Sequence, residues 1–311
     1  MLDVRRMKVL KEVAAQGSFS AAAEALSFTQ SAVSQQVAAL EREAGAKLVE
    51  RRARGIRLTP AGEALVSHAD AILARLDDAE QELAAIAGLK GGRVRVASFQ
   101  SAGATLVPKA LAEFHRRHRE VELSASTAEL AEARDLLRAG DIDVAIVMDF
   151  ESQPLLNAEV EIEHLLNDQY FVALPSDHRL ADEPRVALAD LADEDWINSC
   201  PGTSCDQVVL GACRAAGFDP RVVVECDEND QMQAFVAGGL GVALWPQLAL
   251  AHVRPGVAVK PVAGSPVERR VWAATLAGAY RSAATEAMLE ILRETAEDFT
   301  VHAPLRIAAS S

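Results

Sequence analysis

Short hydroxyl and amide side chains recur between Thr29 and Gln36 at a spacing that would gather several of them on one face of a helix. At about 100° per residue, Ser31, Ser34 and Gln35 point to the same side. A glutamine amide can bond adenine through two hydrogen bonds, and a serine hydroxyl can bond a base edge or a phosphate. Such a face has the chemistry needed to enter the major groove of a DNA duplex. The candidate DNA-contacting residues here are Ser18, Thr29, Gln30, Ser31, Ser34 and Gln35.

A run of arginines supplies the second group of candidates. Residues 48–58 have the pattern of two short strands joined by a basic turn that contains glycine. We expect arginines in this turn to contact phosphates or to reach into the minor groove, where they would supply affinity more than sequence choice. The alternative is that each is an ordinary solvated charge. The candidates are Arg51, Arg52 and Arg54, with Arg57 nearby.

The net charge of −14 is divided unequally along the 311 residues. Residues 1–58 carry ten Lys and Arg against six Asp and Glu, a net charge of +4, which leaves −18 for the remainder. The N-terminal segment is therefore suited to a polyanion, whereas the acidic remainder would repel one. We expect DNA contact at one end of the molecule.

Three short helices would position these side chains. Asp3 can cap a first helix that ends at Gly17, and Ser18 can cap a second helix rich in alanine. After a two-residue turn, Thr29 can cap a third helix that ends near Gly45. The small alanine side chains permit the close helix contact that a helix-turn-helix requires. Together with the basic hairpin, these helices predict a winged helix-turn-helix.

A long helix is expected next, because Thr59 and Pro60 combine a capping hydroxyl with a residue suited to the first helical turn. Its apolar residues alternate at spacings of four and three, which is typical of a coiled-coil seam. The seam predicts pairing with a second helix, and the alternative is packing against the protein's own body. Glycines in residues 88–92 would end the helix and act as a hinge. The seam residues are Leu65, Ala69, Ile72, Leu76, Ala79, Leu83 and Ile86.

From Arg93 onward, strand and helix patterns alternate, which predicts two open α/β lobes. A strand over 269–276 and a helix over 283–299 are expected to return to the first lobe. The remaining first-lobe elements are expected at 94–99, 104–117, 121–126, 130–139 and 144–148. The second-lobe elements are expected at 170–174, 208–216, 222–226, 232–238 and 242–244.

Ligands of open α/β lobes bind beyond the carboxyl ends of the strands. Hydroxyls and free amides at the start of a helix near Asp206 suit an anionic group such as a carboxylate. Glu129 and Asp149 would instead favour a cationic or donor-bearing group, so both charges of ligand stay open. The candidate ligand contacts are Gln100, Ser101, Glu129, Asp149, Ser199, Thr203 and Ser204.

These segments resemble the LysR-type family of transcriptional regulators over nearly the whole chain. The N-terminal resemblance rests on residues 17–20, 29–34 and 58–62, and the C-terminal resemblance on 140–145, 177–181, 195–197 and 237–246. The sequence departs from the family pattern at Ser31, Ala44, Val49 and Arg179.

The resemblance implies a multidomain α and α/β protein: a winged helix-turn-helix, a linker helix that pairs two protomers, and a two-lobed domain similar to periplasmic binding proteins. Its implied partners are double-stranded DNA, a small-molecule effector between the lobes, and further copies of the chain in a homodimer or homotetramer. RNA polymerase is a further candidate. The predicted domains are 1–58, 59–89 and 91–300, with lobe I at about 91–165 and 267–300, lobe II at about 166–266, and a loose tail at 301–311.

Two other functions stay open. The segment from Cys205 to Cys213 is similar to the paired-cysteine segment of peroxide-sensing LysR-type members, so Cys205 is a candidate redox sensor. On one helix, however, the two thiols would lie about 12 Å apart along the axis, too far to bridge. The other alternative is a small-molecule binding protein that lacks DNA function.

Several classes of protein are not indicated. The sequence contains no nucleotide-binding loop, no metal-ligand spacing and no nucleophile elbow, so we expect no enzyme activity, no metal and no cofactor. It opens without a secretion signal, and glycines interrupt its longest apolar stretch. We expect a cytoplasmic protein with reduced cysteines and no membrane partner.

Overall fold

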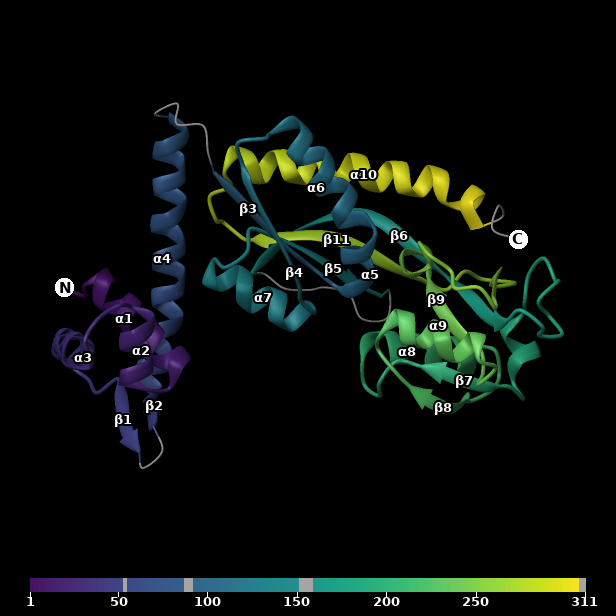
Figure 1. Ribbon diagram of the computed structural model, residues 1–311, viewed down its shortest axis with the longest axis horizontal. Helices are drawn as coiled ribbons and strands as arrows, with labels where there is room; N and C mark the ends of the chain where they lie inside the picture. The colour runs from purple at the N-terminus through teal and green to yellow at the C-terminus, as the bar shows by residue number, and fades with distance from the viewer. Residues whose placement is uncertain (53–54, 87–91, 151–158, 308–311) are drawn as a thin grey trace.

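The computed structural model describes residues 1–52, 55–86, 92–150 and 159–307. Three parts follow one another in space: a small N-terminal head, the long helix α4, and an elongated body of two lobes (Figure 1). The head and α4 lie at one end of the molecule, and the second lobe lies at the other. The predicted fold class is confirmed.

Capping residues determine where the head helices begin and end. The side chains of Asp3, Ser18 and Thr29 accept backbone N–H groups from the first turns of the three helices. Gly17 and Gly45 end the first and third helices with φ of 62° and 68°, a conformation that favours glycine. These caps and stops were predicted and are confirmed. The head consists of α1 (Val4–Gln16), α2 (Phe19–Ala25), α3 (Gln30–Ala44), β1 (Val49–Arg52) and β2 (Gly55–Leu58).

The first turns of α4 (Pro60–Ile86) belong to the head. Leu65 is 9% exposed and Ala69 is fully buried, and both lie in the head's apolar core. The approach is close, because a methyl group at Gly62 would lie 2.1 Å from the carbonyl oxygen of Leu48. The predicted seam is therefore wrong for Leu65 and Ala69, since α4 packs on α1 and uses these two residues to close the core of its own chain.

Lobe I is built on parallel strands with helices on their faces. Strand β3 pairs with β4 on one side and β5 on the other. The predicted helix over 104–117 is wrong at its start. A short helix begins at Gln100 and ends at Ala104, and the second helix begins after Thr105. In a continuous helix, the ring of Pro108 would clash with the carbonyl of Ala104. The elements are β3 (Arg93–Ser98), α5 (Gln100–Ala104), α6 (Leu106–Arg117), β4 (Glu122–Thr127), α7 (Leu130–Ala139) and β5 (Val144–Asp149).

One long strand, β6 (Val160–Pro175), runs from lobe I into lobe II. Its first part pairs with β11 (Glu268–Leu276), and from about Tyr170 onward it pairs with β9 (Ala243–Pro246) and β10 (Val257–Pro261). The sequence predicted this strand only from Tyr170, because charged and polar residues alternate with apolar ones before it and no continuous apolar run marks the strand. The sheet order is β10-β6-β11-β5-β3-β4, with β9 also paired to β6.

Lobe II surrounds the far end of that strand. A separate pair of parallel strands, β7 and β8, carries helices α8 and α9. Two short 3-10 helices, at Leu188–Leu191 and Gln247–Leu250, complete the lobe. The other elements are β7 (Asp195–Asn198), α8 (Ser204–Ala215), β8 (Arg221–Glu225), α9 (Asn229–Ala237), β9 (Ala243–Pro246) and β10 (Val257–Pro261).

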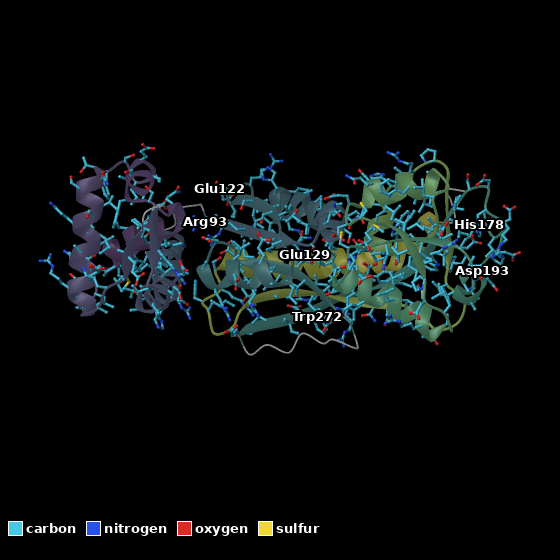
Figure 2. All side chains as sticks on the ribbon, turned by 90° about the horizontal axis from the view of Figure 1, so that it is seen from below. Arg93, Glu122, Glu129, His178, Asp193 and Trp272 are labelled. Atoms are coloured by element: carbon cyan, nitrogen blue, oxygen red, sulfur yellow. The ribbon has the colours of Figure 1, made fainter. Side chains whose placement is uncertain are left out.

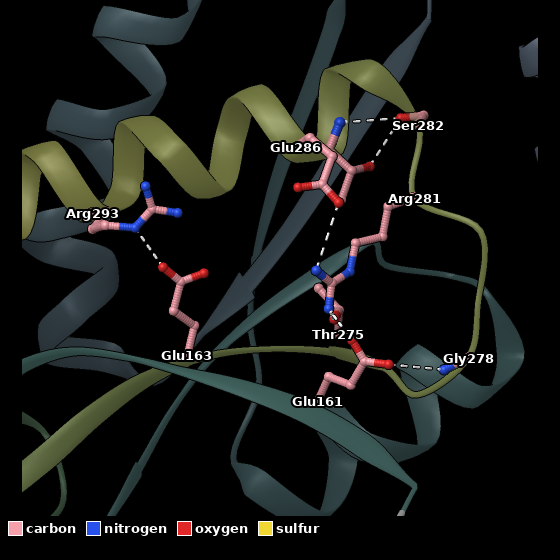
Figure 3. Close-up of polar contacts among 9 residues, drawn as sticks. Glu161, Glu163, Thr275, Gly278, Arg281, Ser282, Glu286 and Arg293 are labelled. Carbon is pink, nitrogen blue, oxygen red and sulfur yellow. Dashed lines mark hydrogen bonds and ion pairs between the residues drawn. The ribbon is translucent and has the colours of Figure 1, made fainter.

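Helix α10 (Ala283–Ile307) returns to lobe I and lies along α6 (Figure 1). The hydroxyl of Ser282 accepts the N–H of Thr285 at 3.1 Å and so caps the helix. Figure 3 shows Arg293 of this helix paired with Glu163 of β6, at 2.5 Å between Nε and Oε1. The last helix is thus attached to the strand that joins the lobes.

The predicted loose tail is wrong over residues 301–307, because α10 continues to Ile307. The prediction rested on the general tendency of chain ends to be poorly ordered, but alanine and leucine in this segment favour helix in spite of Pro304. The final residues, 308–311, lie outside the described part of the chain.

Candidate functional site

The polar side chains of α3 lie on its outer face. Ser34 is half-buried, and the helix buries its opposite face through Val33, Val37 and Leu40. The hydroxyl of Thr29 is shared between capping the N–H of Ala32 and a 3.0 Å hydrogen bond to Ser31. The exposed candidates are Thr29, Gln30, Ser31 and Gln35.

Ionic contacts hold α3 in this orientation. Arg6 of α1 forms an ion pair with Glu43, near the end of α3. Glu41 is buried, and it accepts the N–H of Leu48 at 3.0 Å and the ammonium group of Lys47 at 2.7 Å. Burial acts to raise the pKa of Glu41, but these hydrogen bonds outweigh it and hold the pKa below its ordinary value. A charged carboxylate therefore joins α3 to the hairpin.

The hairpin of β1 and β2 forms the predicted wing. Arg51 and Arg52 lie in β1, opposite Ile56 and Gly55 of β2. Arg54 falls outside the described residues, so its predicted role stays a prediction. Ser18, a further DNA candidate, caps α2 through its hydroxyl, with 3.2 Å to the N–H of Ser20.

The later part of the seam on α4 faces solvent. The exposed fractions of Ile72, Leu76 and Leu83 are 38%, 46% and 65%, and Ala79 is exposed as well. The side chain of Ile86 is not described. A stripe of exposed apolar residues thus follows the two that the head buries.

A cavity of about 550 Å³ lies between the two lobes. This volume falls within the range of small-molecule sites. Figure 2 shows Glu129 at the middle of the molecule, where the lobes meet. Six predicted ligand contacts line the cavity: Gln100, Ser101, Glu129, Ser199, Thr203 and Ser204.

The seventh predicted contact, Asp149, is wrong. Asp149 is 4% exposed and does not line the cavity. Its two carboxylate oxygens accept hydrogen bonds from Arg270 at 2.8 and 2.9 Å, and the indole N–H of Trp272 donates to it at 2.9 Å. The residue does follow a parallel strand, but partners on the antiparallel neighbour β11 already occupy its carboxylate.

Arg269, which was not among the predicted ligand contacts, lines the cavity. The side chain is 2% exposed and forms a buried ion pair with Asp168, at 2.8 Å between Nη2 and Oδ2. It also donates to the hydroxyl of Ser101 at 2.6 Å and lies over the ring of Phe99. Its position in a predicted strand was the sequence signal that could have indicated it, because an arginine that a strand buries needs a partner.

Carboxylates surround the opening of the cavity. Burial raises the pKa of Glu129, and Asp227 adds to this effect while Arg269 opposes it. Glu228 accepts a hydrogen bond from Gln100, which joins lobe II to lobe I. The cavity therefore combines an acidic opening with a buried guanidinium group.

The two cysteines of α8 are differently placed. Cys205 lines the cavity, and the hydroxyl of Tyr170 lies 3.9 Å from its sulfur. Cys213 is buried in the apolar core of lobe II. Burial raises the pKa of Cys205, and it raises the pKa of Cys213 to about 12. Both groups therefore favour the thiol over the reactive thiolate.

The described residues lack the features of a metal site and of a membrane-spanning helix. They contain no group of three or more His, Cys, Asp or Glu side chains placed to hold a metal ion. Within the same part of the chain, none of the helices has the length and apolar character needed to cross a bilayer.

Comparison with known proteins gives consistent results across the chain. Residues 4–63 match the family model described as "Bacterial regulatory helix-turn-helix protein, lysR family", and residues 87–297 match "LysR substrate binding domain". A probable HTH-type transcriptional regulator, LrrA of Synechococcus elongatus, is 33% identical over 96% of this chain and 98% of its own length. ShiR of Corynebacterium glutamicum, an HTH-type transcriptional regulator, is 31% identical over 93% of this chain and 98% of its own length.

A solved structure shows the same architecture. A variant of full-length OxyR from Pseudomonas aeruginosa superimposes with a TM-score of 0.74 at 26% identity, over 94% of this chain and 98% of that chain.

Proposed function

This chain belongs to the LysR family of transcriptional regulators, and on that premise we propose which of its surfaces carry out regulation. The polar face of α3 reads DNA, and a small molecule held in the interlobe cavity controls how the head is presented. The observation that carries this proposal is the outward face of Gln30, Ser31 and Gln35 on a helix whose other face is buried. The family consists of transcriptional regulators, so we assign no catalytic residue.

The charge distribution supports DNA binding at the head. Arg51, Arg52 and Arg54 of the wing would contact the phosphate backbone beside the recognition helix. The acidic body would be repelled by the same duplex. An exposed recognition face also argues against a binding protein that has lost its DNA function.

Contacts between the head, α4 and lobe I support a mechanical connection to the cavity. Lys11 of α1 lies 3.0 Å from Asp70 of α4 and 3.9 Å from Asp141 of lobe I. Arg75 of α4 donates a hydrogen bond to the carbonyl of Gly278. These contacts would therefore transmit a movement of the lobes to α4 and the head. The predicted hinge at 88–92 lies mostly outside the described residues, and its role stays a prediction.

Pairing of two chains through α4 would present two heads to a two-fold-related DNA site. The exposed stripe of Ile72, Leu76, Ala79 and Leu83 supports a homodimer. A homotetramer and contact with RNA polymerase stay predictions. We also infer a cytoplasmic location, since the DNA to be regulated is there.

The DNA proposal is tested by gel shift with the DNA upstream of the chain's own gene, at low salt. Gln35→Ala should weaken binding roughly tenfold, because a good bidentate base contact contributes about 1–3 kcal/mol. Gln16→Ala removes an exposed amide from α1 and should leave binding unchanged. Equal binding by both variants would remove α3 from the proposed site, and failure of the wild type to bind any duplex would overturn the DNA role itself.

Redox sensing through Cys205 is the second candidate function. Its place in the cavity wall favours it, but the raised pKa of the thiol does not. If peroxide changes DNA binding by the wild type and not by Cys205→Ser, this candidate gains support over a ligand that binds without chemistry.

A further inference from the structure

Groups of opposite chemistry face the interlobe cavity, and from them we propose that the effector is a small zwitterion of the amino-acid type. Its carboxylate, or a similar oxyanion, binds at the buried wall near Arg269 and Trp245. Its ammonium group binds between Glu129 of lobe I and Asp227 of lobe II. This inference rests on the proposed function, because it names the chemical class of effector for the same cavity.

The buried wall has donor capacity that the protein does not use fully. Arg269 directs Nε to Asp168 at 2.9 Å and Nη2 to the hydroxyl of Ser101 at 2.6 Å. Its Nη1 donates to the thioether sulfur of Met148 at 3.0 Å. Because a thioether is a weak acceptor, this part of a permanently charged group is poorly satisfied. A ligand oxyanion would be a much better acceptor.

Trp245 provides a second donor in the same wall. The residue lines the cavity and is 2% exposed, and within the described part of the chain its indole N–H has no hydrogen-bond partner. A buried N–H without an acceptor is costly, so most such groups in proteins are paired. An acceptor atom supplied by the ligand would pair it.

The start of α8 adds a third feature that favours an anion. Thr203 caps this 12-residue helix and lines the cavity together with Ser204. The carboxylate of Asp206 already has partners, because it accepts a hydrogen bond from the side-chain amide of Asn198 in β7 at 2.8 Å and one from the N–H of Gly202, in the loop before α8, at 2.9 Å. The positive end of the helix dipole therefore faces the cavity, and the carboxylate of Asp206 is not among the groups that line it.

The opening of the cavity has the opposite character. Glu129 and Asp227 line it from opposite lobes, and among the described residues no hydrogen bond or ion pair engages the carboxylate of Glu129. Asp227 accepts the backbone N–H of Cys200, a neutral donor that does not compensate the negative charge of the carboxylate. Two carboxylates that approach as the lobes close repel each other, whereas an ammonium group between them would attract both. The cationic end of the ligand would thus favour closure.

A purely anionic ligand would satisfy the buried wall and leave the acidic opening uncompensated. A simple amine would do the reverse. A cavity of about 550 Å³ readily holds a molecule that carries both groups.

The test uses the full-length protein and isothermal titration calorimetry. The probes are the twenty L-amino acids, β-alanine and 4-aminobutyrate, each compared with the carboxylate that lacks the amino group and the amine that lacks the carboxylate. We expect at least one zwitterion to bind, and its two analogues to bind at least tenfold more weakly.

Variants then assign the two ends of the ligand. Glu129→Gln should weaken binding of the zwitterion roughly tenfold while leaving the deaminated carboxylate unaffected. Trp245→Phe should weaken both ligands about fivefold. Glu122→Gln, an exposed carboxylate at the far end of lobe I (Figure 2), is the matched control and should change neither. Thermal unfolding checks that each variant is folded.

Three outcomes would each overturn the inference. The carboxylates could bind as tightly as the zwitterions, Glu129→Gln could bind the zwitterion as the control does, or no zwitterion in the panel could bind. The proposed function is judged separately by the gel shift. DNA binding by the wild type, weakened in Gln35→Ala, would stand even if the ligand class is wrong.

Discussion

At the scale of single residues, the cavity is determined by which charged groups already have partners. Asp149 and Arg270 neutralise each other, and so do Asp168 and Arg269, yet of these four residues Arg269 alone lines the cavity. Among the described residues Glu129 has no comparable partner, so its carboxyl group stays available to a ligand. Position after a strand was therefore a poorer guide to the ligand site than the state of pairing.

The Arg269–Asp168 pair allows a stability prediction. Arg269→Met should lower the free energy of unfolding by about 3–5 kcal/mol, because Asp168 would remain buried without a counter-charge. Replacing Asp168 as well, with leucine, should recover part of the loss, though the N–H of Leu248 would lose its acceptor. Urea denaturation of the full chain measures both variants.

The matched control is Arg214→Met, which breaks an exposed ion pair with Asp219. Exposed pairs contribute at most about 1 kcal/mol, so this change should be small. A loss in Arg269→Met no larger than in the control would mean that the buried pair is not a structural requirement.

At the scale of elements, α4 has two roles along one stripe. Its first apolar residues complete the head, and its later ones stay exposed. The coiled-coil pattern identified the stripe correctly but could not separate these roles, because both kinds of contact require the same apolar spacing.

The exposed part of the stripe predicts self-association. Leu76→Asp should raise the dimer dissociation constant at least tenfold, because a charge would be buried in an apolar interface. Sedimentation equilibrium measures the change in mass. Leu240→Asp, on lobe II, alters a residue of nearly equal exposure, 47% against 46%, and should leave the mass unchanged. An unaltered dimer in Leu76→Asp would exclude this stripe as the interface.

At the scale of the whole molecule, the proposed function requires that a conformational change in the lobes is transmitted to the head. One close contact joins lobe I to the linker helix: Gly140 ends α7 with φ of 66°, and a methyl group there would lie 2.3 Å from Cβ of Ala74 on α4. Glycine at this position permits both the left-handed turn and the approach of the linker helix.

Gly140→Ala should therefore lower the free energy of unfolding for two reasons: alanine disfavours the positive φ, and its methyl group would clash with Ala74. Gly239→Ala is the matched control, since Gly239 also has a positive φ of 74° and no atom within 4 Å of an added methyl. We expect about 1 kcal/mol of destabilisation in the control and about 1–3 kcal/mol more in Gly140→Ala. Thermal unfolding measures both, and a parallel gel shift should show altered DNA affinity in Gly140→Ala alone. Equal behaviour of the two variants would indicate that α4 does not depend on this contact.

The sequence by itself determined the local features of this protein. Caps at Asp3, Ser18 and Thr29, the stops at Gly17 and Gly45, and the outward polar face of α3 depend on neighbours within a few residues, so pattern and propensity were enough. The resemblance to LysR-type regulators supplied the order of the domains and the expectation that a ligand binds between two lobes.

Only the tertiary structure decided which side chains are left for a partner. Leu65 and Ala69 close the head, Asp149 is engaged by Arg270, and Arg269 reaches the cavity from a strand more than a hundred residues beyond Ser101. Each outcome depends on contacts between residues far apart in the chain, and burial and charge pairing there are properties of the folded molecule, which the spacing of residues along a sequence does not contain.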